Sequence, residues 1–173
     1  MTNIPPQPQY SPIELAVIHA LDTTSIALRG QNAKDKVWTR RIKEELDQAG
    51  QTLRPTPYIT CTNFLYDVTW MTLNQSNRIT DIGMVLECEW GMDRKGMFRV
   101  MYDFDKLLFA RADTRVMVFQ AHSAVCAQTL TEMQSLIRGF SKTKPGDRYL
   151  FACWNRTPAP NNRAFDYQLF VAP

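Results

Sequence analysis

An alternation of apolar and polar positions between residues 81 and 90 is the clearest pattern in the chain. Every second position there is apolar: Ile82, Met84, Leu86, Cys88 and Trp90. The positions between them include Asp81, Val85, Glu87 and Glu89. Side chains alternate between the two faces of a strand. The pattern therefore predicts a strand with one buried, apolar face and a second face that carries acids.

Four further segments have the composition of strands. Residues 67–73 are rich in β-branched and aromatic side chains, and the turn-forming residues 74–77 follow them directly. This order predicts a hairpin or a short crossover to the alternating strand. Residues 116–119 are apolar on both faces, as in a buried parallel strand. Residues 149–154 and 165–171 predict two more strands, joined by a connection rich in Pro and Asn.

Two helices are predicted before the first strand. The first begins at residues 11–14 (SPIE), which combine an N-cap serine, a proline at the first helical position and a glutamate three residues after the cap. It extends to about Leu21, and the polar residues 22–32 form a loop or a continuation of it. The second helix covers residues 33–49, and we expect Gly50 to end it.

Two further helices are predicted between the later strands. Apolar positions recur at helical spacing over residues 97–112. Ser123 can cap a helix that reaches Arg138, with Gly139 as its C-terminal residue. The resulting order, α-α-β-β-α-β-α-β-β, predicts an α/β domain with a mixed central sheet and helices on both faces.

The length and composition are those of one ordinary globular domain. At 173 residues and 20.0 kDa the chain can bury a single core. We therefore expect one domain over residues 1–173, in which the Pro-rich residues 1–10 form an extended arm. No apolar run approaches the roughly 18–20 residues of a membrane span. The N-terminus also lacks the pattern of a signal peptide, so we expect no membrane association and a cytoplasmic location.

The cysteines and the net charge exclude little else. Four cysteines are scattered without a C-x-x-C pair, namely Cys61, Cys88, Cys126 and Cys153. With only two histidines as partners, a zinc site is not expected, and the cysteines are interpreted as small buried side chains in a reduced compartment. The net charge of +3 permits an anionic partner without requiring one.

The acids of the alternating strand repel each other. Side chains two positions apart on a strand are roughly 6.5–7 Å apart, so Glu87 and Glu89 repel by about 2–3 kcal/mol at an effective dielectric constant near 20. If the preceding strand brings Asp67 alongside, a divalent cation would turn this repulsion into attraction. Mg²⁺ suits such a cluster because it binds one or two carboxylates and completes its shell with water and phosphate oxygens. Each acid taken alone is more typical of a solvated strand face or a turn.

The order of these acids matches a known motif. Asp67 opens one strand, and Glu87 and Glu89 follow in the next strand, beginning 20 residues later. A helix containing residues 103–108 (DFDKLL) and an apolar strand come after them. This arrangement resembles the restriction-endonuclease-like PD-(D/E)xK superfamily of metal-dependent nucleases over about residues 33–121.

The resemblance implies a restriction-endonuclease-like α/β/α fold and Mg²⁺-dependent endonuclease activity on DNA phosphodiester bonds, with Mn²⁺ as an alternative ion. Asp67 and Glu87 would bind the ion, and Glu89 would orient the attacking water or accept its proton. Glu89 stands where most members have lysine, so Lys106 in the following helix is the candidate for that lysine. Tyr66 stands in place of the motif's proline.

Further residues receive roles from the same resemblance. Glu45, or with less support Glu14, would add a metal ligand. Basic residues of two segments would contact phosphates of duplex DNA, namely Lys34, Lys36, Arg40, Arg41, Lys43, Lys142 and Lys144. Such a small chain would act as a homodimer to cut both strands. Asp103 and Asp105 are expected to be surface acids.

Two other functions are compatible with the sequence. A catalytically inactive pseudo-nuclease would bind nucleic acid or a protein partner, since an acid at position 89 also fits an inactive copy of the motif. An α/β interaction protein unrelated to nucleases would simply expose its strand acids to water. Trp38, Trp90 and Trp154 are interpreted as core or subunit contacts rather than as platforms for nucleic-acid bases.

Overall fold

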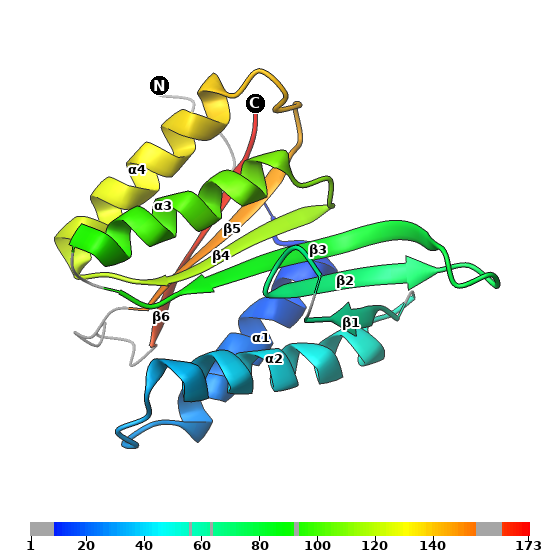
Figure 1. Cartoon of the computed structure of the whole chain (residues 1–173), viewed down its shortest axis with the longest axis horizontal. Helices are drawn as coiled ribbons and strands as arrows, with labels where there is room; N and C mark the ends of the chain where they lie inside the picture. Colours follow the sequence, from blue (N-terminus) through cyan, green and yellow to red (C-terminus); the bar gives the residue numbers. More distant parts are fainter. Residues whose placement is uncertain (1–8, 56, 63, 92–93, 155–163) are drawn as a thin grey trace, which may run out of the picture.

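The chain folds around one six-stranded sheet that has helices on both faces (Figure 1). The computed structural model describes residues 9–55, 57–62, 64–91, 94–154 and 164–173. The greater part of the expected N-terminal arm and the Pro/Asn-rich connection before residue 164 lie outside these ranges.

The six strands lie side by side in chain order. They are β1 (Ile59–Cys61), β2 (Val68–Leu73), β3 (Ile79–Glu89), β4 (Thr114–Gln120), β5 (Arg148–Trp154) and β6 (Phe165–Val171). β3, β4 and β5 are parallel, whereas β1, β2 and β6 join their neighbours antiparallel. The mixed sheet is therefore as predicted, with β1 as the one strand that the sequence pattern did not predict.

Two helices cover each face of the sheet. One pair is α1 (Pro12–Ala27) and α2 (Asp35–Thr52), and the other is α3 (Arg94–Phe109) and α4 (Ser123–Gly139). The two pairs lie on opposite sides of the sheet (Figure 1). α3 and α4 each connect two parallel strands, and crossovers of one hand place both helices on the same face. The coarse prediction of an α/β domain with helices on both faces is confirmed.

The core consists of two apolar clusters, one on each side of the sheet. The cluster beneath α1 and α2 includes Val17, Ile42 and Trp70, and the cluster beneath α3 and α4 includes Phe104 and Phe151. Every residue of β4 is buried, which confirms the prediction of a central strand covered on both faces.

Three tryptophans form one corner of the first cluster. The rings of Trp90 and Trp154 lie 6.0 and 5.5 Å from the ring of Trp38, and 6.5 Å from each other. Trp90 Nε1 donates a hydrogen bond of 2.8 Å to Thr39 Oγ1 of α2. Their packing agrees with the interpretation of these residues as core side chains.

The prediction of a single buried face on β3 is wrong. Residues 83–88 are all buried, because α3 covers the face that carries the acids. The alternation is also interrupted: consecutive residues of β2 pair with Ile82 and Met84, so Gly83 forms a bulge. Ile82 consequently packs on the α3 and α4 side instead of with Met84. A Cβ atom at Gly83 would lie 2.5 Å from the ring of Tyr58, which explains the glycine.

Helix boundaries differ from the predictions at several ends. The N-terminal capping box of α1 is confirmed, and the helix continues beyond Leu21 to Ala27, which is the second of the two alternatives left open for residues 22–32. α2 passes through Gly50, where a Cβ atom would lie 3.0 Å from the indole of Trp70, so this glycine serves packing and does not end the helix. α3 begins and ends three residues earlier than predicted. Ser123 is the first residue of α4, and His122, not Ser123, occupies the N-cap position.

Candidate active site

Glu87 and Lys106 meet between the sheet and α3. Glu87 lies near the C-terminal end of β3, and only 4% of its side chain is exposed. Lys106 reaches it from α3, with its Nζ 2.7 Å from Glu87 Oε1. The same Nζ lies 2.8 Å from Oδ1 of Asp103, one helical turn earlier. One lysine therefore holds two carboxylates from different elements.

The surroundings of this ion pair shift the pKa values of both Glu87 and Lys106. Burial raises the pKa of Glu87 to about 7. The hydrogen bond and charge of Lys106 act to lower this pKa, and the charges of Asp103 and Asp67 add smaller increases. Burial works to lower the pKa of Lys106, but its hydrogen bonds to Asp103 and Glu87 prevail and raise that pKa. Glu87 can thus gain or lose a proton near neutral pH beside a lysine that stays charged.

Asp67 lies across from Glu87 at the start of the hairpin. Val68 pairs with Leu86 in an antiparallel register, so the residue before Val68 lies next to the residues after Leu86. Asp67 Oδ2 accepts a hydrogen bond of 3.0 Å from the backbone N–H of Cys88. Two strands therefore bring the predicted acids Asp67 and Glu87 together.

A second lysine approaches Asp67 from the other side of the sheet. Lys43 of α2 lies with its Nζ 2.9 Å from Asp67 Oδ1. Each of the two acids therefore has a lysine of its own, Asp67 from α2 and Glu87 from α3. Sequence reasoning assigned Lys43 only to phosphate contacts and did not foresee this pairing, because no sequence motif links the two residues.

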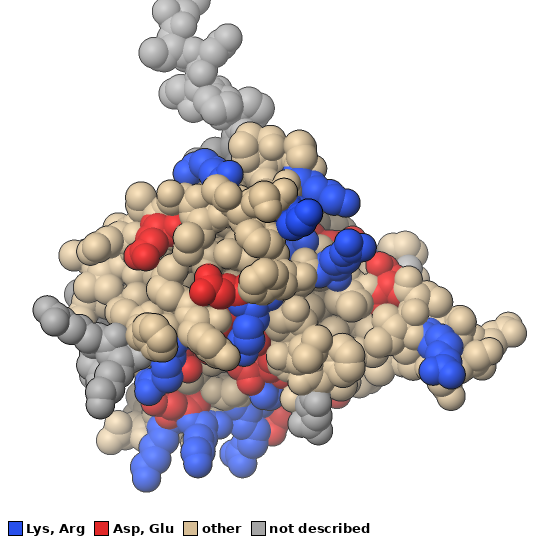
Figure 2. All heavy atoms as spheres, turned by 45° about the horizontal axis from the view of Figure 1, so that its top comes forward, with Lys and Arg blue, Asp and Glu red and all other residues tan. Residues whose placement is uncertain are grey.

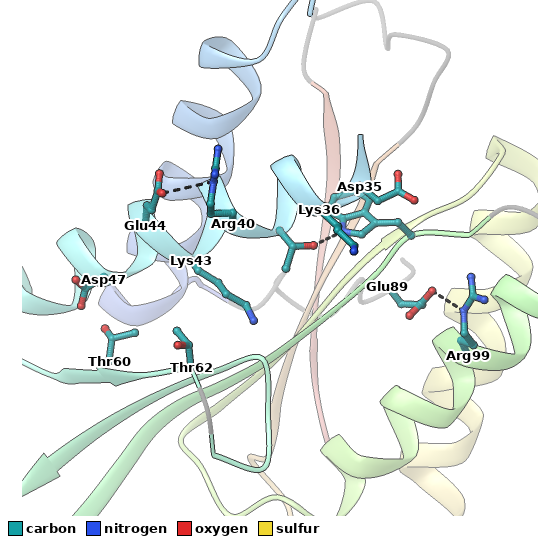
Figure 3. Close-up of a pocket in the computed structure, with 12 residues that line it drawn as sticks. Asp35, Lys36, Arg40, Lys43, Glu44, Asp47, Thr60, Thr62, Glu89 and Arg99 are labelled. Atoms are coloured by element: carbon teal, nitrogen blue, oxygen red, sulfur yellow. Dashed lines mark hydrogen bonds and ion pairs between the residues drawn. The ribbon is translucent and has the colours of Figure 1, made fainter. Parts of the chain in front are cut away.

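Glu89 occupies a different environment from Glu87. It forms an ion pair of 2.8 Å with Arg99 Nε of α3 and lines a cavity of about 870 Å³. Lys36, Arg40 and Lys43 line the same cavity from α2. In Figure 3, Lys43 extends from α2 toward the cavity, while Glu89 and Arg99 point toward each other from the opposite side.

Acids offset the positive charge of this cavity. Its lining also contains Asp35, Glu44 and Asp47 of α2, of which Glu44 lies 3.8 Å from Arg40. Among the described residues, acidic and basic side chains line the cavity in equal numbers. Contacts with an anion would therefore depend on individual cations such as Lys43, and not on a broad positive field.

The two additional candidate metal ligands lie in other surroundings. Glu45 forms an ion pair with Arg41 of the same helix. Glu14 is fully buried and forms an ion pair with Arg148, at the opposite ends of the parallel strands from Glu87. Within the ranges that the structure describes, no three His, Cys, Asp or Glu side chains converge to hold a metal ion.

The predicted nucleic-acid contacts separate into two areas. Lys36, Arg40 and Lys43 line the cavity beside Glu89, with Lys34 at the N-cap of α2. Arg41, which was also predicted to contact phosphates, pairs with Glu44 and Glu45. Lys142 and Lys144 border a second cavity, near the N-terminal ends of β4 and β5. Figure 2 likewise shows Lys and Arg side chains gathered in separate areas.

Asp103 is the residue of this site that the sequence interpretation misjudged. It was expected to be a surface acid, yet its side chain is only 16% exposed and is paired with Lys106. Asp105, two residues later, is exposed as expected. The signal available in the sequence was the three-residue spacing between Asp103 and Lys106, which places both side chains on one helix face.

Comparisons with protein-family models, with curated proteins and with solved structures found no match for this chain. Among the described helices, none is both long enough and apolar enough to cross a membrane.

Proposed function

We propose that this chain is a Mg²⁺-dependent nuclease of the PD-(D/E)xK type that hydrolyses DNA phosphodiester bonds. The observation that carries the proposal is the arrangement of two acids and one lysine from three elements. Glu87 on β3 pairs with Lys106 on α3, and Asp67 before β2 accepts a hydrogen bond from the backbone N–H of Cys88, next to Glu87. In this proposal Lys106 supplies, from the helix, the lysine that the motif places at position 89.

The carboxylates present are compatible with Mg²⁺. This ion needs only one or two protein carboxylates and keeps several water ligands. Glu87, whose pKa is raised to about 7, would lose its proton to solvent when a cation binds at neutral pH. A bound Mg²⁺ or Mn²⁺ would polarise the scissile phosphate and acidify a water molecule.

The lysines have complementary roles in the proposed reaction. Lys106 remains charged and can donate a hydrogen bond to a phosphate oxygen or to the attacking water. Asp103 acts as a positioning residue that keeps the Lys106 ammonium beside Glu87. Glu89, at the edge of the neighbouring cavity, would orient the water once substrate separates it from Arg99.

The substrate strand would enter along the cavity of about 870 Å³ beside α2. Lys36, Arg40 and Lys43 would contact backbone phosphates there, a contribution that weakens with salt and does not depend on sequence. Cleavage of both strands of a duplex would involve a second copy of the chain.

Plasmid cleavage tests the proposal. Glu87→Gln and Asp67→Asn should each lower the Mg²⁺-dependent cleavage rate by at least about 100-fold. Asp105→Asn, at an exposed position two residues from Asp103, is the matched control and should cleave as the wild type does. Equal cleavage by all four proteins, or cleavage that persists in EDTA, would contradict the proposal.

A binding module without catalysis is the second candidate function. It is favoured by the lysine that neutralises each acid, Lys43 at Asp67 and Lys106 at Glu87, since paired acids have no electrostatic need for a metal. Calorimetric titration with Mg²⁺ separates the two functions. If the chain is a nuclease, Mg²⁺ binding should produce heat, and Asp67→Asn should abolish that heat. A binding module should bind DNA but produce no heat with Mg²⁺.

A further inference from the structure

A second cavity, of about 570 Å³, lies at the opposite end of the sheet from Glu89. Its walls come from the end of α3, the start of β4 and the connection between α4 and β5. β3, β4 and β5 run parallel, so this cavity borders their N-terminal ends, while Glu87 and Glu89 lie near the C-terminal end of β3. None of the residues that the structure describes lines both cavities.

A buried arginine forms one wall of this second cavity. Arg115 of β4 is only 6% exposed. Its Nε and Nη2 donate hydrogen bonds of 3.1 and 2.8 Å to the carbonyl oxygen of Ala110, just after α3. Its Nη1 lies 3.4 Å from Asp147 Oδ1, and the guanidinium covers the ring of Tyr149. These contacts fix a positive charge in place at the cavity.

Three more cations surround the cavity from two connections. They are Arg111, after α3, and Lys142 and Lys144, after α4. Considering the described part of the chain, no carboxylate forms an ion pair with any of these three side chains. Their charges are therefore available to an anion.

The cavity lining also offers an aromatic ring and hydrogen-bond acceptors. Phe109 lines the cavity with 71% of its surface exposed and packs edge-on against Phe140, with 5.4 Å between the ring centres. Asp81 and Asp113 also line it. Exposed aromatic rings stack with nucleobases, and carboxylates accept hydrogen bonds from base N–H groups.

We propose that this cavity binds a small nucleoside phosphate. The phosphate would lie among Arg111, Lys142 and Lys144, and the base would lie against Phe109 within reach of the two acids. The volume is in the range of ordinary small-molecule sites, and charge-assisted hydrogen bonds to phosphate are strong. This inference does not depend on the proposed nuclease activity.

Calorimetry on the full chain tests this site with AMP, adenosine and inorganic phosphate as probes. AMP should bind at least about tenfold more tightly than adenosine or phosphate alone, because only AMP carries both the phosphate for the cations and the base for Phe109. The pair of substitutions Arg111→Ala and Lys142→Ala should weaken AMP binding by about tenfold or more. Phe109→Ala should weaken AMP binding but leave phosphate binding unchanged.

The control is the pair Lys36→Ala and Arg40→Ala, which removes two cations from the other cavity and should leave AMP binding at the wild-type level. The substituted side chains at positions 109, 111 and 142 are exposed, and thermal melting verifies that each variant is folded. Absence of AMP binding to the folded wild type would overturn the inference. So would phosphate binding as tight as AMP binding, or AMP binding lost only in the control pair.

Discussion

The ammonium nitrogen of Lys106 lies 2.7 Å from a carboxylate oxygen of Glu87, and it joins the last turn of α3 to the C-terminal half of β3. The same ammonium holds Asp103. Because Glu87 is buried and its pKa is raised to about 7, the charge of this carboxylate changes near neutral pH.

The free energy of unfolding should fall as the pH rises through the range from about 4.5 to 7. In this window the folded chain binds a proton at Glu87 more tightly than the unfolded chain does, so the proton stabilises the fold and its loss destabilises it. The expected decrease between pH 5 and pH 8.5 is about 2 kcal/mol, measured by urea denaturation without metal. Glu87→Gln should lack this component, and an unchanged pH dependence in the variant would refute the assignment.

Replacing Lys43 by methionine should weaken DNA binding and disturb Asp67. The variant loses one phosphate contact and the ion pair that orients Asp67, so the slope of log K against log salt should become shallower by about 1. Filter binding at several salt concentrations measures this slope. Arg78→Met, at an exposed position in the turn between β2 and β3 and outside the predicted DNA contacts, should leave the slope almost unchanged. Equal slopes in both variants would argue against strand entry beside α2.

Gly83→Ala should destabilise the chain by about 1–3 kcal/mol, because the new methyl group would overlap the ring of Tyr58 at the bulge of β3. Gly139→Ala is the matched control, since a Cβ atom there has no neighbour within 4 Å. It should be neutral or slightly stabilising at the end of α4. Thermal denaturation of both variants gives the comparison. A Gly83→Ala variant as stable as the wild type would mean that the ring of Tyr58 moves aside without lowering the stability of the fold.

Glu14→Gln should lower the free energy of unfolding by about 2–3 kcal/mol while leaving DNA cleavage intact. The buried carboxylate of Glu14 pairs with Arg148 through both oxygens, and the neutral amide would leave that guanidinium without its counter-charge. Glu132→Gln, on the exposed side of α4, controls for the loss of a negative charge. Loss of cleavage in a stable Glu14→Gln variant would instead support the role of Glu14 as a metal ligand.

Most of the elements of this fold could be predicted from local sequence patterns, and the errors have physical causes. β1 has three residues, too few to show an alternation. Gly50 and Gly83 were ambiguous because a glycine that ends a helix and a glycine that makes room for a ring look alike in sequence. Only the positions of Trp70 and Tyr58 across the core distinguish these uses.

The two acids of the candidate site could be predicted from the sequence, but most of the contacts around them could not. Asp67 and Glu87 could be paired from their spacing on neighbouring strands, and Lys106 from the motif. The pairing of Lys43 with Asp67 depends on how α2 packs against the sheet, which no local pattern encodes. The burial of Glu87 likewise depends on α3, which follows it in the chain.

The grouping of Trp38, Trp90 and Trp154 gives this protein an intrinsic optical reporter. Trp90 belongs both to the aromatic group and to the lining of the cavity beside α2. A molecule that enters this cavity would change the polarity around one indole and the energy transfer among all three. Changes in emission would therefore follow occupancy there without any attached dye, while the cavity at the far end of the sheet would leave the spectrum unaltered.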